Sequence, residues 1–186
     1  MRILACADLH GRPERIARVK SLVTEHAPGV VVLPGDLTHM GFGEDALNLL
    51  TSLPVRVLAV PGNMDAASAI AGIARGGGLE GTEPLLIDGI SFGGPKADRG
   101  VDVLVVHEPP LGTLDRVSTG RHIGSQHVLT LLTRLRPRVI TCGHVHESPG
   151  IARVGETVVV NCTMGDGRTG GALIEISAER VDARLV

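Results

Sequence analysis

The sequence predicts an α/β fold, a four-layer α/β/β/α sandwich in which two mixed β-sheets are flanked by helices. In the first half, short apolar runs alternate with segments whose apolar residues recur at helical spacing, which is typical of parallel βα units. Late in the chain, short strand-like runs follow one another through turns, as in antiparallel sheets. With 186 residues, 43% of them hydrophobic, the chain is expected to form one domain over residues 1–186.

The first half is expected to hold three strands, each followed by a helix. The first helix begins at Pro13, a residue that suits the first turn of a helix, and it ends near His26. Its apolar stripe is Ile16, Val19, Leu22 and Val23. The strands are expected at about residues 2–7, 30–33 and 55–60, and the later helices at about 43–52 and 65–75.

The second half is expected to begin with a hairpin around Asp88-Gly89, with strands at 85–87 and 90–92. A strand at 101–106 then precedes a long loop, a helix at about 125–135 and a strand at 138–142. Four short strands follow, at 151–154, 157–160, 171–176 and 181–185. This change of pattern predicts two sheets that face each other, with helices outside.

Five apolar runs each lead into a polar residue at the carboxyl end. The run Val30–Leu33 is followed by Pro34-Gly35-Asp36, and the others lead to comparable blocks. An isolated Asp after a strand has an ordinary explanation as a turn residue, but five repeats of the layout favour a metal site with Asp36 at its centre. The polar residues so placed are Asp8, His10, Asp36, Asn63, His107, His144 and His146.

This donor set contains three oxygen ligands and four imidazoles. Seven ligands exceed what one ion needs, whereas two ions that share a carboxylate would use them all. Mixed oxygen and nitrogen ligands without thiolate suit Mn, Fe or Zn better than Cu(I). Two ions about 3.5–4 Å apart can hold a bridging hydroxide and stabilise in-line displacement at phosphorus.

The ordered blocks resemble the calcineurin-like metallophosphoesterase family. The blocks are Asp8-Leu9-His10, Gly35-Asp36, Gly62-Asn63-Met64-Asp65, His107 and Gly143-His144-Val145-His146. The resemblance implies that Asp8, His10, Asp36 and His146 hold one divalent ion, and that Asp36, Asn63, His107 and His144 hold the other. Mn²⁺ is the favoured ion for both positions, with Fe, Zn, Ni and Mg as alternatives.

Within that family, His107–Gly112 and His144–Ile151 resemble the small cyclic-nucleotide-phosphodiesterase-like branch. The resemblance implies hydrolysis of small phosphodiesters such as cyclic nucleotides, with Asp36, Asn63 and His144 in the catalytic centre. One position departs from the family pattern, because Met64 stands where a His usually follows the Asn. Met cannot donate a proton, so alkyl monoesters are expected to be poor substrates. The alternative is that Met64 only packs beneath the site.

A substrate contact is expected at His122, in the segment Arg121-His122-Ile123-Gly124-Ser125. A helix that opens at Ser125 would offer free N–H groups to a phosphate, and His122 could donate a further hydrogen bond. His39, Arg12 and Arg121 are further candidates. For each of these side chains, ordinary exposure on a surface loop is the competing interpretation.

Composition argues against several other classes. The net charge of −2 and the absence of a basic stripe argue against a nucleic-acid partner. A nuclease and a binding module without activity are the alternatives. Phe42 and Phe92 are the only aromatic residues, so base stacking on exposed rings is not expected. No apolar run reaches the length of a membrane span. Three cysteines without paired spacing favour a cytoplasmic protein. An oligomer remains open.

Overall fold

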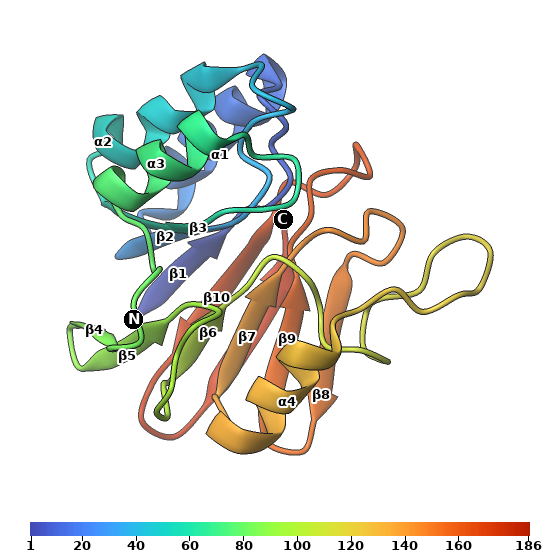
Figure 1. Ribbon diagram of the computed structural model, residues 1–186. Coiled ribbons are helices and arrows are strands. Elements are labelled where there is room, and N and C mark those ends of the chain that lie inside the picture. Colours follow the sequence, from blue (N-terminus) through green and yellow to red (C-terminus); the bar gives the residue numbers. More distant parts are fainter.

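Two β-sheets lie face to face in the computed structural model, which describes residues 1–186, and helices cover the outer side of each sheet (Figure 1). This arrangement confirms the predicted four-layer α/β/β/α fold. No helix has the length and apolar character that a membrane-spanning helix requires.

The first sheet has the strand order β11-β10-β1-β2-β3. Strands β1, β2 and β3 are parallel, β10 runs antiparallel to β1, and β11 runs antiparallel to β10. The strands are β1 (Arg2–Ala5), β2 (Val30–Pro34), β3 (Arg56–Val60), β10 (Ala172–Ile176) and β11 (Val181–Leu185). The sheet therefore joins the beginning of the chain to its end.

The second sheet has the strand order β4-β5-β6-β7-β9-β8. Its inner strands β5, β6, β7 and β9 are parallel, while the edge strands β4 and β8 are antiparallel to their neighbours. The strands are β4 (Leu85–Ile87), β5 (Ile90–Gly93), β6 (Val103–Val105), β7 (Val139–Cys142), β8 (Gly150–Val154) and β9 (Thr157–Asn161). Both sheets are mixed, as predicted, and the hairpin of β4 and β5 is confirmed.

Alternation along the strands divides the core into layers. Ile3 and Val32 point between the sheets and pack with Val105 and Val160 of the second sheet. Their neighbours point outward against the helices, because successive side chains of a strand face opposite sides. Helices α1 (Pro13–His26), α2 (Leu49–Ser52) and α3 (Ala67–Gly76) cover the first sheet, and α4 (Gln126–Leu135) covers the second (Figure 1).

The prediction of one α-helix at about residues 43–52 is wrong, because only the last four of these residues are α-helical. A 3₁₀ helix, η1 (Glu44–Asn48), comes first, and only the single turn α2 is α-helical. The start lacks a side-chain cap, since Gly43 precedes it in a left-handed conformation. Pro54 disfavours α-helical geometry in the residue before it and so stops the segment at Leu53. The apolar spacing gave no sign of this because 3₁₀ and α turns bury similar positions.

Candidate metal centre

The polar residues that follow the strands gather at one edge of the molecule. Asp8, Asp36 and Asn63 come after β1, β2 and β3 of the first sheet. His107 and His144 follow β6 and β7 of the second sheet. The carboxyl ends of parallel strands lie at the same edge of a sheet, and the two sheets face each other, so both sets of side chains meet.

The backbone is strained at this edge. Four of the seven candidate ligands adopt left-handed conformations that non-glycine residues seldom occupy, with φ of 61° at Asp8, 49° at His10, 53° at Asp36 and 67° at His144. Such conformations cost of order 1–3 kcal/mol each and persist where the surrounding structure imposes them. Their concentration here indicates that the turns are shaped to aim these side chains at a common point.

Two glycines allow these turns to approach one another closely. A Cβ at Gly62 would overlap Asp36 Oδ1, and a Cβ at Gly143 would lie 2.5 Å from Asp8 Oδ2. The glycine before Asn63 and the glycine before His144 therefore make room for carboxylates that arrive from neighbouring strands.

Asp8, His10 and His146 form the first group of donors, with one potential ligand atom from each within 4.8 Å of the others. The Nε2 atoms of His10 and His146 lie 3.3 Å apart, and His146 Nε2 lies 3.7 Å from Asp8 Oδ1. Burial lowers the pKa of His10 to about 4, which leaves its ring neutral and able to act as a ligand. Hydrogen bonding to Asp8 instead raises the pKa of His146.

Asn63, His107 and His144 form the second group, next to Asp36. Asn63 Oδ1 lies 2.8 Å from His107 Nε2 and 2.9 Å from His144 Nδ1. His107 Nδ1 lies 3.0 Å from the Pro34 carbonyl oxygen, so that nitrogen carries the proton and donates it to the carbonyl. Its Nε2 faces Asn63 and His144, the other donors of this group. A hydrogen bond donated by the ring nitrogen that does not bind the metal commonly orients a metal-ligating His.

Asp36 links the two groups through one oxygen. Its Oδ1 accepts a hydrogen bond of 2.7 Å from the Met64 N–H. Its Oδ2 lies 4.0 Å from His10 Nε2 and 3.5 Å from His107 Nε2, and thus faces both groups. Asp8 also lies near His107, because one potential ligand atom from each of Asp8, Asp36 and His107 lies within 4.8 Å of the others.

The residues present fit divalent cations. Asp8 and Asp36 are both buried, and burial raises the pKa of Asp36, an effect to which the charge of Asp8 adds. Two buried carboxylates side by side repel one another and lose their hydration. A cation bound among them would relieve both costs, and the oxygen and imidazole donors suit Mn, Fe, Zn or Ni.

A cavity of about 640 Å³ opens over these donors. Its walls include Arg12, Arg15, His39, Phe42 and Met64, alongside candidate ligands from both groups. Arg12 and Arg15 give the cavity a cationic wall beside Asp36.

The sequence profile described as calcineurin-like phosphoesterase matches residues 1–148. The chain belongs to the calcineurin-like phosphoesterase family. The predicted resemblance is thereby confirmed, and the family is one of metal-dependent phosphoesterases.

Relatives and solved structures agree with the family. Protein MJ1162 of Methanocaldococcus jannaschii is 29% identical in an alignment 195 positions long, which covers 87% of each chain. The protein T07D4.2 of Caenorhabditis elegans is 42% identical over 66 residues, which are 35% of this chain and only 17% of that longer protein. A structure described as a novel archaeal phosphodiesterase has the same fold, with a TM-score of 0.65, 16% identity and coverage of 100% of both chains.

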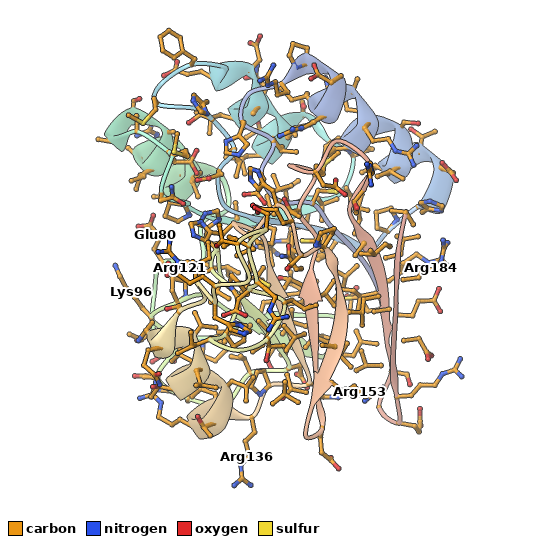
Figure 2. The ribbon with its side chains drawn as sticks, turned by 90° about the vertical axis from the view of Figure 1, so that its right-hand side faces the viewer. Glu80, Lys96, Arg121, Arg136, Arg153 and Arg184 are labelled. Atoms are coloured by element: carbon orange, nitrogen blue, oxygen red, sulfur yellow. The ribbon has the colours of Figure 1, made fainter.

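The phosphoesterase cavity does not include His122 or Arg121. The loop that carries them extends from the side of the molecule, at the right in Figure 1 and toward the viewer in Figure 2, where Arg121 is labelled. His122 Nδ1 lies 2.6 Å from Oδ1 of buried Asp115, whose Oδ2 accepts the N–H groups of Gly112 and Gly124. His122 thus helps to fasten its own loop. Ser125 caps α4 as predicted, and its side chain accepts the Val128 N–H.

Sequence reasoning assigned no role at the site to three residues of this phosphoesterase centre. Arg15 lines the cavity, and its guanidinium donates a hydrogen bond of 2.6 Å to the Asp8 carbonyl. Its place in the first turn of α1, three residues after Arg12, could have indicated it. Asp65 is buried and accepts hydrogen bonds from two loops. Phe42 is exposed at the cavity, so the expectation that no ring would be available for stacking is wrong.

Proposed function

We propose that this chain is a dinuclear metal-dependent phosphodiesterase that acts on small phosphodiesters such as cyclic nucleotides. The placement of Asp36 Oδ2 between the two donor groups carries the proposal, because a shared carboxylate is the ligand that a pair of ions requires. Two bound divalent ions, Mn²⁺ in the first instance, would supply an activated nucleophile and charge stabilisation at phosphorus.

The proposed ligand sets follow the two groups. Asp8, His10, Asp36 and His146 would hold one ion, and Asp36, Asn63, His107 and His144 would hold the other. Support comes from the convergence of the first set around Asp8 and of the second around Asn63 Oδ1. Asp36, Asn63 and His144 therefore remain the proposed catalytic centre.

The cationic wall formed by Arg12 and Arg15 would orient the substrate. Arg12 and Arg15 line the same cavity as the donors, and a guanidinium can hold two phosphate oxygens through parallel hydrogen bonds. Arg15 is fixed by its bond to the Asp8 carbonyl, so it would hold an anion in a defined position relative to the first ligand group. This wall takes the phosphate-positioning role that the sequence suggested for His122.

Met64 places a sharp limit on the substrate. Its side chain lines the cavity where a proton donor would act, and its N–H orients Asp36. We expect ready hydrolysis of bis(p-nitrophenyl) phosphate, whose leaving group needs no protonation, and weak hydrolysis of an alkyl monoester such as glycerol 2-phosphate. Met64→His should raise monoester hydrolysis at least about tenfold and diester hydrolysis much less.

Steady-state kinetics on both substrates tests this expectation. Met40→His serves as the matched control, because Met40 does not line the cavity and a His tolerates its left-handed backbone. Equal rates on the two substrates in the unaltered protein would contradict it, since another group would then supply the proton.

The state of the three cysteines supports the proposed cytoplasmic localisation. Cys6, Cys142 and Cys162 are all free and buried, and burial raises the pKa of Cys6 to about 12. Thiols in this state pack as small apolar side chains and need no oxidising compartment.

A further inference from the structure

An exposed aromatic side chain stands at the metal-site cavity. Phe42 lines the cavity and is 76% exposed, and Met40, two residues earlier, is 66% exposed. The chain has no Trp or Tyr, and its other aromatic residue, Phe92, is fully buried in the core. The one Phe side chain that the fold leaves in water therefore lies at the metal-site cavity, and an exposed apolar side chain at a cavity marks a contact surface.

A tight turn presents this ring. His39 and Phe42 exchange backbone hydrogen bonds of 3.0 and 2.9 Å across Met40 and Gly41, whose φ angles are 51° and 88°. Positive φ at both central positions is the signature of a type I′ turn. Methionine seldom occupies such a position, so the conformation is imposed by the surroundings.

Two contacts fix the turn to the metal site. The Met40 N–H donates a hydrogen bond of 2.8 Å to the Met64 carbonyl, in the loop that carries Asn63. On the other side, the backbones of Gly11 and Gly43 touch, and a Cβ on either would overlap the other. Gly43, which follows the turn, therefore packs against Gly11, the residue before Arg12. The backbone of Phe42 is thus fixed relative to the candidate metal ligands and to the cationic wall.

We propose that Phe42 is a specificity-determining residue that stacks against an aromatic group of the substrate, a nucleobase or an aryl ring. The phosphate would lie over the candidate metal ligands, with Arg12 and Arg15 beside it and the ring of the substrate on Phe42. The inference rests on the proposed phosphodiesterase function and narrows its substrate class. A cavity of about 640 Å³ is large enough, since pockets for ligands of this kind span ~300–1,000 Å³.

Equilibrium binding tests this role without relying on turnover. The Mn²⁺-loaded protein is titrated by calorimetry with adenosine monophosphate and with ribose 5-phosphate, which share a phosphate and a ribose and differ in the base. Stacking of one base on an aromatic side chain should make adenosine monophosphate bind at least about fivefold more tightly. Phe42→Ala should remove most of this difference and leave ribose 5-phosphate binding unchanged, whereas Phe42→Trp should keep it.

Leu86→Ala is the matched control, because Leu86 is 67% exposed on β4 and does not line the cavity. It should leave both affinities unchanged. The inference is overturned if the unaltered protein binds the two ligands equally, or if Phe42→Ala weakens both to the same extent. Hydrolysis of bis(p-nitrophenyl) phosphate is measured on the same preparation. Equal binding with hydrolysis intact contradicts only the role of Phe42, whereas failure to hydrolyse any diester contradicts the proposed function.

Discussion

Asp36→Asn is expected to lower diester hydrolysis at least about a hundredfold and to weaken both metal positions together. Loss of a residue that merely supports a ligand costs 10–100-fold in metal affinity or activity, and Asp36 is proposed to contact both ions directly. His10→Ala should mainly weaken one position, because His10 belongs to the first donor group alone. Elemental analysis after dialysis against a fixed metal concentration counts the ions per chain in each variant.

Without metal, the same substitution is not expected to destabilise the protein. Burial raises the pKa of Asp36, and removing one of two buried carboxylates relieves repulsion, so Asp36→Asn should leave the metal-free Tm unchanged or raise it. Asn still accepts the Met64 N–H, which preserves the local turn. Asp98→Asn, on the exposed surface, serves as control. Two full equivalents of metal in Asp36→Asn would show that the carboxylate is not shared.

Asp65→Ala should lower the free energy of unfolding by about 3 kcal/mol, because it leaves several buried donors without a partner. Asp65 accepts hydrogen bonds from the N–H and the hydroxyl of Thr38, both 2.8 Å, and from the N–H groups of Leu37 at 3.3 Å and Gly62 at 2.9 Å. These bonds join the loop after β2 to the loop after β3, which carry Asp36 and Asn63. Urea denaturation of the metal-free protein measures the change.

Asp65→Asn provides a graded comparison, since it keeps one acceptor oxygen and should cost less than Asp65→Ala. Asp98→Ala should stay within about 0.5 kcal/mol of the unaltered protein, as is usual for an exposed position. A loss below about 1 kcal/mol in Asp65→Ala would mean that backbone bonds alone hold the two loops together.

Strand and helix positions could largely be predicted because burial imposes a period on the sequence. The apolar run Val30–Leu33 and the stripe from Ile16 to Val23 correspond to β2 and α1. The parallel pairing of β9 with β7 could not be read in this way, since period alone does not fix strand partners. The 3₁₀ helix η1 was missed for the related reason that its burial pattern over five residues resembles an α turn.

The candidate ligands could be predicted because each stands two to five residues after the carboxyl end of a strand, where topology fixes its place. Arg15 and Phe42 could not, since their roles depend on contacts with segments distant in sequence: the Asp8 carbonyl for Arg15, and the Gly11–Gly43 contact for Phe42. His122 shows the opposite case. A Gly-flanked His before a helix suggested a phosphate site, but buried Asp115, seven residues earlier, holds its ring within the loop.

The most direct test of metal-dependent phosphodiester hydrolysis is a chelation and reconstitution assay on the unaltered protein with bis(p-nitrophenyl) phosphate. Treatment with a chelator followed by its removal should abolish hydrolysis, and Mn²⁺ added back should restore it as the second equivalent binds. Restoration complete at one equivalent would contradict a dinuclear centre. Hydrolysis that persists in the metal-free protein, or that no divalent ion restores, would contradict the central claim.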